Sequence, residues 1–474
     1  MLESKRALVT VVAALLLLLV SLTACDMTGL PATPTPRITP TSQALQPTVT
    51  STATGTVAIA LQDTQEPTPI PATETQEPAL TPAKTTTPPT TGSGNAQIDR
   101  LLEQIKTDTA KLRGLEPKKK VPEQFITQQQ LNENLKRDMA EDYTPEEARR
   151  DAVALWLLRL VNDPSIDLYQ LYLDLLTEQV AGYYDPEKDE LFVLGNQQRL
   201  SPLARQTLAH EFVHALQDQH YDLEKLLPEE TEDDDRSLAV RALVEGDATM
   251  AGLMYAYRYL SKEDFADMLE ESQSASTEVL DRSPRYIRES LLFPYDAGSE
   301  FVSRLIEQGG FERVNQALAD PPASTEQVMH PDKYLNSPRD NPLPVPMPPL
   351  TDTLGTGWKQ TDQGTLGEFD LKVMLEDNGV TPADEAAAGW GGGRYALYQR
   401  GEAALMIVDT RWDTPADARE FENALRQSFA EAQQSNGLWV LGGRFFGMKS
   451  AGDRITFISS TDRSALENAL AVVR

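Results

Sequence analysis

The chain has 474 residues, 40% of them hydrophobic, and a formal net charge of −29. This length can hold two modest domains. So large a negative charge argues against nucleic acid as a partner and opposes binding to anionic lipid headgroups. The single cysteine excludes an intramolecular disulfide.

A leader is predicted over residues 1–25. Lys5 and Arg6 precede an apolar run, residues 7–20, that is short for a membrane span. Leu22-Thr-Ala-Cys25 follows and resembles a bacterial lipobox, in which the cysteine is acylated and becomes the first mature residue. The alternative is an uncleaved signal anchor with an incidental cysteine. Both predict that the rest of the chain lies outside the cytoplasmic membrane, and a lipid on Cys25 predicts a bacterial membrane lipoprotein facing outwards.

Residues 26–95 are dominated by Thr, Pro, Ser and Ala. Such a composition cannot bury a core, so this segment is predicted to be a disordered, extended stalk.

The folded part is predicted to begin near residue 96, with a first domain over 96–345. Thr127 and the pair Thr144-Pro145 are typical helix starts. The pattern predicts an amphipathic helix at 97–113 and a short strand at 121–127. It then predicts a helix capped by Thr127 at 128–139, a helix from Pro145 onward and a buried helix at 168–176. Segments 179–184 and 190–194 flank a turn-forming stretch and predict a β-hairpin.

The next helix carries two of the four histidines, as His210-Glu-Phe-Val-His214. Ser201 and Pro202 predict its start. Residues four apart on a helix lie about 6 Å apart along its axis, so both imidazoles can reach one cation, for which zinc is suited. Glu211 points away from that cation but can bond a water beside it, which makes it the candidate general base.

A third ligand would distinguish a metal site from two ordinary histidines on a helix, and the sequence offers two candidates for it. His220 would need the helix to end early, but Gln217 stands where a glycine would permit that, so His220 is expected to be structural or to lie behind the ligands. Glu245 lies in a second helical pattern, residues 235–259, and would complete a His2Glu site with one open position.

Two neighbours of Glu245 add to this pattern. Gly246 would let two helices approach closely. Asp247 could orient a ligand histidine from behind, although its spacing from Glu245 points it elsewhere on the helix. The chain is then expected to stay helical to about Gly309.

Four segments together resemble a group of largely uncharacterised bacterial zincin-like peptidases, and more broadly the gluzincin branch of zinc metallopeptidases, which includes thermolysin. The likeness covers roughly residues 96–345. The segments are His210-Glu-Phe-Val-His-Ala-Leu-Gln-Asp-Gln-His220, Val244-Glu-Gly-Asp-Ala248, Pro294-Tyr-Asp-Ala-Gly298 and Ser324-Thr-Glu-Gln-Val-Met-His-Pro-Asp-Lys-Tyr334.

This resemblance implies a mostly helical zincin-like domain with a small edge sheet, in which His210, His214 and Glu245 bind Zn2+ and Glu211 activates water. Thermolysin-type enzymes carry an aspartate four residues after the glutamate, where this chain has Thr249.

The resemblance also implies further substrate contacts. An edge strand beside the cleft would pair with an extended peptide through Gly182, Tyr183 and Tyr184. Negative charge develops on the attacked carbonyl oxygen, and the candidate donors to it are His330, Tyr295 and Tyr334. His330 comes first because this chain has only four histidines and His330 follows the two zinc helices, as in thermolysin-like enzymes; the alternative is a structural histidine in a loop.

Prolines between residues 341 and 353 predict a linker, so a second domain is expected over 346–474. Its strands are predicted at 395–398, 403–409, 439–441, 444–446 and 454–458. Helices are predicted from Thr414-Pro415 to about Ala432 and from Ser464. These elements predict a small α+β domain with an antiparallel sheet.

Together these features favour a lipid-anchored, extracytoplasmic zinc metallopeptidase of α+β fold acting on peptides or proteins. The alternatives are a non-catalytic binding or scaffold protein that keeps a zincin shell, and a zinc amidase acting on peptidoglycan.

Overall fold

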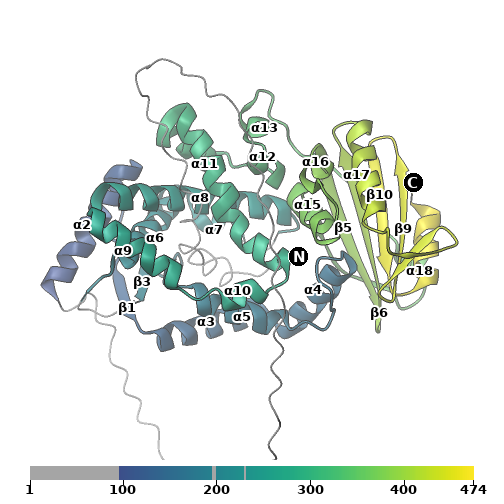
Figure 1. Ribbon diagram of the computed structural model, residues 1–474, viewed down its shortest axis with the longest axis horizontal. Helices are drawn as coiled ribbons and strands as arrows, with labels where there is room; N and C mark the ends of the chain where they lie inside the picture. Colours follow the sequence, from purple (N-terminus) through teal and green to yellow (C-terminus); the bar gives the residue numbers. More distant parts are fainter. Residues whose placement is uncertain (1–94, 195–198, 229–230, 474) are drawn as a thin grey trace, which may run out of the picture. The chain divides into compact units, whose positions relative to one another are not determined.

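The computed structural model describes residues 95–194, 199–228 and 231–473. It is α+β, with helices predominating before residue 340 and a seven-stranded antiparallel sheet after it (Figure 1). The predicted stalk, the leader and Cys25 lie outside the described residues. Among the described helices, none has the length and apolar character required of a membrane span.

The helical part begins with four helices and a short strand that precede a hairpin, all within the expected order. These are α2 (Ala96–Arg113), β1 (Glu123–Ile126), α3 (Gln128–Asp142), α4 (Pro145–Leu157) and α5 (Leu168–Gln179). Thr127 and Thr144 each form a capping box at the start of the following helix, as predicted. Helix α5 runs to Gln179, so the first hairpin strand starts later than the sequence pattern suggested.

The hairpin consists of β2 (Gly182–Asp185) and β3 (Glu190–Leu194), which are antiparallel. Strand β1 pairs in parallel with β3, so the order of this three-stranded sheet is β1-β3-β2. Strand β2 is therefore an edge strand, as the hairpin prediction required, whereas the parallel partner was not predicted.

Two long helices follow, α6 (Pro202–Tyr221) and α8 (Asp234–Tyr259), separated by α7 (Leu223–Leu226). Ser201 caps α6 as predicted: its hydroxyl accepts a hydrogen bond from the Ala204 N–H at 3.2 Å. Helix α6 ends at Tyr221 without a glycine; the residue that follows, Asp222, has a φ of 63°.

The remaining helices of this part are α9 (Lys262–Ser274), α10 (Glu278–Arg282), α11 (Arg285–Ala319), α12 (Thr325–Met329) and α13 (Pro331–Leu335). The backbone of α11 breaks at Gly309 and Gly310, where the helical stretch was expected to end. Helix α11 crosses α8 at two glycines. A Cβ on Gly246 would overlap the main chain of Gly298, and one on Gly298 would overlap that of Ala242. The predicted close approach at Gly246 is thus confirmed.

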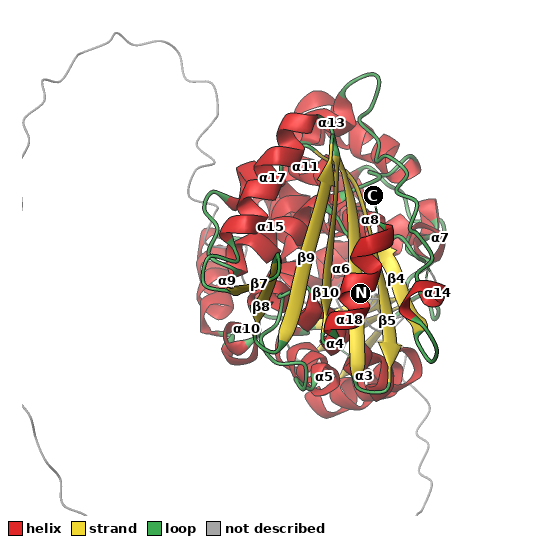
Figure 2. Cartoon of the chain, turned by 90° about the vertical axis from the view of Figure 1, so that its right-hand side faces the viewer, coloured by secondary structure: helices red, strands yellow, loops and turns green. Residues whose placement is uncertain are grey.

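The C-terminal sheet has the order β4-β5-β6-β10-β9-β8-β7 and is antiparallel throughout (Figure 2). Its strands are β4 (Lys359–Thr365), β5 (Trp390–Arg400), β6 (Ala403–Trp412), β7 (Gln433–Ser435), β8 (Leu438–Leu441), β9 (Arg444–Ala451) and β10 (Arg454–Ser460). The accompanying helices are α14 (Thr351–Leu354), α15 (Glu368–Asp377), α16 (Ala383–Ala387), α17 (Pro415–Gln427) and α18 (Arg463–Val472).

Alternate residues of the central strands face two separate cores. Leu397 and Met406 pack with α15, α17 and the core of the helical part, whereas Tyr398 and Leu405 pack with α14 and α18. Elements β4, α15 and α16 were not predicted, and α17 ends at Gln427 rather than Ala432, since the β7–β8 hairpin takes up the following residues.

The proline-rich segment has no regular structure between residues 341 and 350, but it is packed against the sheet. The N–H of Leu343 donates to the Gly391 carbonyl, and Val345 and Leu350 are buried. All described residues belong to one compact unit. The segment therefore connects two structural parts that share a continuous core.

Candidate metal centre

Close packing of α6 against α8 brings the candidate ligands together. A Cβ on Gly252 of α8 would stand 3.4 Å from the Cβ of His210 and 3.1 Å from the Gln206 amide nitrogen on α6. Because α8 can lie this close, the short carboxylate side chain of Glu245 reaches both histidines. His210, His214 and Glu245 are all buried.

Three ligand atoms converge at this point. The Nε2 atoms of His210 and His214 lie 3.1 Å apart, and Glu245 Oε2 lies 3.3 Å from the first and 3.4 Å from the second. A tetrahedral zinc site with bonds of about 2.0–2.1 Å separates its ligand atoms by roughly 3.3 Å. The triangle therefore has the dimensions that three of four tetrahedral zinc ligands require.

The polar atoms of this triangle also need a cation for chemical reasons. Glu245 Oε2 is buried and makes no hydrogen bond within the described part of the chain. A buried carboxylate oxygen without a partner is costly. Although burial opposes ionisation, the two imidazoles lower the pKa of Glu245, so the carboxylate is charged. The donor set of two imidazoles and one carboxylate fits zinc with one position open.

Glu211 lies beside this triangle without belonging to it. Its Oε2 accepts a hydrogen bond from the Tyr184 N–H at 3.0 Å, and its Oε1 has no hydrogen-bond partner among the described residues. Burial raises the pKa of Glu211 to about 8; His214 lowers this pKa and Glu245 raises it. One oxygen is thus fixed by the strand, and the other is available to accept a proton.

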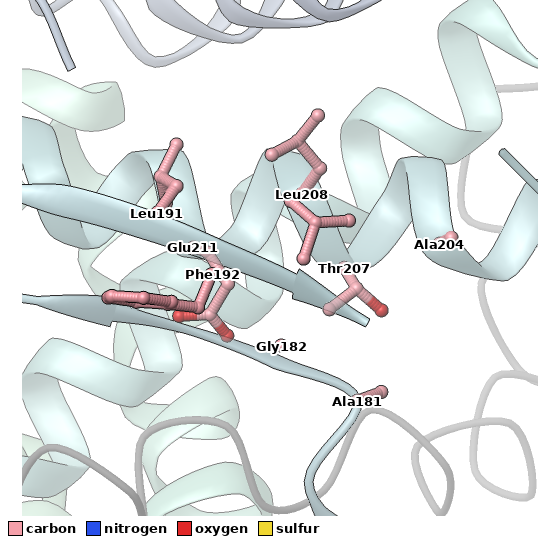
Figure 3. A pocket seen from close by; sticks show the side chains of 9 residues that line it. Ala181, Gly182, Leu191, Phe192, Ala204, Thr207, Leu208 and Glu211 are labelled. Carbon is pink, nitrogen blue, oxygen red and sulfur yellow. The ribbon is translucent and has the colours of Figure 1, made fainter. Parts of the chain in front are cut away.

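A pocket adjoins Glu211 and is shown in Figure 3. Its lining comes from α6, from β3 and from the start of the edge strand β2, and includes Thr207, Phe192 and Gly182. The Leu194 N–H donates to the Ala181 carbonyl across the hairpin. By the alternation of antiparallel bonding, the main-chain groups of Gly182 and Tyr184 point away from β3. The Tyr184 N–H binds Glu211, which leaves the Gly182 groups on the pocket side.

The tyrosine side chains of this strand have structural partners. Tyr183 is buried, its ring stacks on Phe192, and its hydroxyl oxygen accepts a hydrogen bond from the Asn134 amide at 3.1 Å. The Tyr184 hydroxyl lies 2.9 Å from Asp218. Any contact of this strand with a ligand therefore falls to the main chain rather than to these two rings.

Gln217 was not among the predicted site residues, yet it holds a ligand directly. Its Oε1 lies 2.8 Å from His214 Nδ1, and its amide nitrogen donates to Asp247 at 2.8 Å and to the Val244 carbonyl at 2.9 Å. Since the amide nitrogen is the donor in both bonds, Oε1 must accept a proton from His214 Nδ1. In the neutral imidazole, that proton leaves Nε2 with its lone pair facing the triangle.

Asp247 acts on His214 only through Gln217, and it is balanced by a distant residue. The Arg113 Nε donates to Asp247 Oδ1 at 2.6 Å, and both side chains are fully buried. The Arg113 guanidinium also lies 4.7 Å from the centroid of the Phe311 ring. Asp247 was a candidate for orienting a ligand histidine; the structure places Gln217 between the two.

Tyr295 is the one predicted oxyanion donor that lies at the triangle. Its ring is stacked 6.5 Å from that of His210, centroid to centroid. The structure places the other two candidates elsewhere. His330 Nε2 lies 2.8 Å from Glu368 on α15, and the Tyr334 hydroxyl donates to the Asp320 carbonyl at 2.9 Å. Neither contact belongs to the ligand group: His330 is partly exposed and meets α15, and the Tyr334 ring packs against Phe301 of α11.

His220 is also separate from the ligand group. Helix α6 continues past it to Tyr221, and its Nε2 lies 2.8 Å from the Glu116 carbonyl. Because Gln217 stands where a glycine would let α6 end, the helix continues and His220 lies away from the triangle, as predicted.

Comparison with known proteins gives a family for one segment. Residues 353–470 match a family model described as "Domain of unknown function (DUF8575)". No curated protein and no solved structure matches the chain significantly. The match covers the C-terminal sheet and its helices and does not include the ligand triangle.

Proposed function

We propose that this protein is a zinc metallopeptidase of zincin-like fold that hydrolyses peptide bonds outside the cytoplasmic membrane, to which a lipid on Cys25 anchors it. The observation that carries the proposal is the triangle of His210, His214 and Glu245 with Glu211 beside it. Zinc at this triangle supplies a Lewis acid that polarises an amide carbonyl and lowers the pKa of a water molecule.

Glu211 is the general base of this proposal. Its free Oε1 takes a proton from water and delivers it to the leaving amine, while the Tyr184 N–H keeps the carboxylate in place through Oε2. A base whose pKa lies near the working pH can both accept and release a proton, and a pKa of about 8 meets that condition. A cation at the triangle would lower this raised pKa and so favour the charged carboxylate that accepts the proton.

The edge strand supports a peptide as the substrate. An extended peptide can add to a free strand edge through main-chain hydrogen bonds. Gly182 offers such groups next to the pocket that Glu211 lines. A Cβ on Gly182 would lie 2.9 Å from the Phe192 carbonyl oxygen, so glycine at this position keeps the start of β2 close to β3.

The test is a pair of variants of the full chain, Glu211→Gln and the control Glu300→Gln, which changes an exposed glutamate of α11. We expect Glu211→Gln to lower kcat at least about 100-fold, because it removes the proton acceptor and leaves the metal ligands intact. Zinc content, measured by mass spectrometry of the purified protein, is expected to stay near one ion per chain in all three proteins.

The substrates of this test separate the alternatives. A proteome-derived peptide library and purified cell-wall muropeptides are incubated with each protein, with and without a chelator. Cleavage of peptides alone supports the proposal, and cleavage of muropeptide amide bonds alone favours the peptidoglycan amidase. If zinc is bound and nothing is cleaved, the scaffold protein is favoured.

A further inference from the structure

Arg241 stands one helical turn before Glu245 on α8, on the same face of that helix. It is half-buried. Among the residues that the structure describes, no hydrogen bond or ion pair holds its guanidinium. Other arginines near the centre are paired: Arg113 binds Asp247, and Arg205 binds Asp264 at 3.1 Å.

The charges that act on Arg241 are those of the metal centre. Burial lowers the pKa of Arg241, while Glu245 and Tyr295 favour its charged form. Glu245 faces both histidines through Oε2, and Tyr295 stacks on His210. The helical spacing therefore places Arg241 one turn of α8 from the triangle.

Glu245 cannot serve as the partner of this guanidinium. Its Oε2 is directed at the two imidazoles, and the structure shows no ion pair between it and Arg241 within 4 Å. A half-buried guanidinium without a partner is unfavourable, and its planar fork of N–H groups matches a carboxylate. The missing partner is then an anion that arrives with the substrate.

We propose that Arg241 binds a carboxylate of the substrate close to the bond that is cleaved; this inference rests on the proposed peptidase function. One helical turn is about 5.4 Å, and an extended peptide advances about 3.4 Å per residue. The carboxylate is therefore expected within about two residues of the scissile bond. It is either the C-terminal carboxylate of a peptide or the side chain of Asp or Glu.

The experiment compares matched peptides on the zinc-loaded full chain. One peptide sequence is made with a C-terminal carboxylate and with a C-terminal amide, and a second pair carries Glu or Gln two residues after the cleaved bond. The variants are Arg241→Gln, Arg241→Lys and Arg258→Gln, the last an exposed arginine on the same helix.

We expect the wild-type protein to prefer the carboxylate member of one pair by about 10- to 100-fold in kcat/KM, the range of a charge-assisted contact. Arg241→Gln should remove this preference and leave the neutral peptide unaffected, while Arg241→Lys keeps part of it and Arg258→Gln all of it. The pair that shows the preference identifies the source of the carboxylate.

Equal loss on charged and neutral peptides would overturn the inference, as would a preference that survives in Arg241→Gln. Zinc content and melting temperature show whether the variants are folded. If the wild type cleaves neither member of either pair, the proposed function fails. Binding of the same peptides, labelled with a fluorophore, then tests the role of Arg241. A binding preference for the carboxylate peptide that is lost in Arg241→Gln supports the site, and equal affinities for both peptides refute it.

Discussion

Among the residues that the structure describes, two groups of acidic or histidine side chains have ligand atoms close enough to hold one cation. The first is the metal centre of His210, His214 and Glu245, and the second is Glu326, Asp340 and Asp413. In the second group the chain supplies its own cation. The Lys333 ammonium lies 2.6 Å from Glu326, 2.9 Å from Asp340 and 2.7 Å from Asp413.

The comparison shows what separates a metal site from an ion-pair cluster. In both groups several acceptors meet, but only the second contains a lysine. The ion-pair partners of Glu245 within the described chain are the two histidines, whose Nε2 atoms face the same point as its own oxygen. An uncompensated group of acceptors is therefore better evidence for a bound metal than proximity alone.

The strongest way to break this comparison is to remove a ligand from the first group. Glu245→Ala leaves two imidazoles and is expected to lower zinc affinity more than 100-fold, beyond the 10- to 100-fold typical of residues behind the ligands. Zinc affinity is measured by competition with a chromophoric chelator. Glu326→Ala, the matched change in the second group, should leave it unchanged; equal effects from both variants would refute the distinction.

The next change removes the cation of the second group. Lys333→Met leaves three carboxylates together and should reduce the free energy of unfolding by about 1–3 kcal/mol, less than for a fully buried pair because Asp340 and Asp413 are partly exposed. Millimolar calcium should raise the melting temperature of this variant but not that of the wild type, because oxygen ligands suit calcium. A variant as stable as the wild type in urea unfolding would show that the lysine is dispensable.

A smaller effect is expected behind the ligands. Gln217→Ala removes the acceptor that fixes the proton of His214 on Nδ1 and should lower zinc affinity about 10- to 100-fold. Gln219 lies on the same helix as Gln217 and has an exposed contact with the Lys118 N–H, so Gln219→Ala serves as the control. Unchanged zinc affinity in Gln217→Ala would mean that the ring is held by packing alone.

Much of the metal centre follows from the sequence because its ligands lie on regular helices. Helical spacing places His210 and His214 on one face, and a second apolar pattern places Glu245 on a neighbouring helix. The glycine beside Glu245 indicates the close crossing. The DUF8575 match adds nothing to this site, since it covers only the C-terminal sheet and its helices.

The supporting residues could not be predicted in the same way. Arg113 meets Asp247 across 134 positions of sequence, and no local pattern records such a contact. Gln217 was considered only as an obstacle to a helix end. His330 was selected because histidines are rare here, and rarity carries no information on position; the structure sets it against Glu368. Strand β4 was missed because its exposed, polar residues lack the alternation of a half-buried strand.

The smallest predicted effect extends the comparison to a buried carboxylate whose nearest partner is neutral. Asp151 accepts a hydrogen bond from the Tyr143 hydroxyl at 2.9 Å, while Arg150 Nε stays 3.9 Å away. Burial raises the pKa of Asp151 to about 7. Above about pH 4 the unfolded chain has already released this proton, whereas the folded state still holds it. The free energy of unfolding therefore falls as the pH rises towards 7. Between pH 6 and pH 7 the loss should be on the order of 1 kcal/mol, and Asp151→Asn should remove that part of the slope in urea unfolding. The same slope in both proteins would assign the pH dependence to other groups, and Asp174→Asn, which changes a carboxylate on the surface of α5, should leave it unaltered.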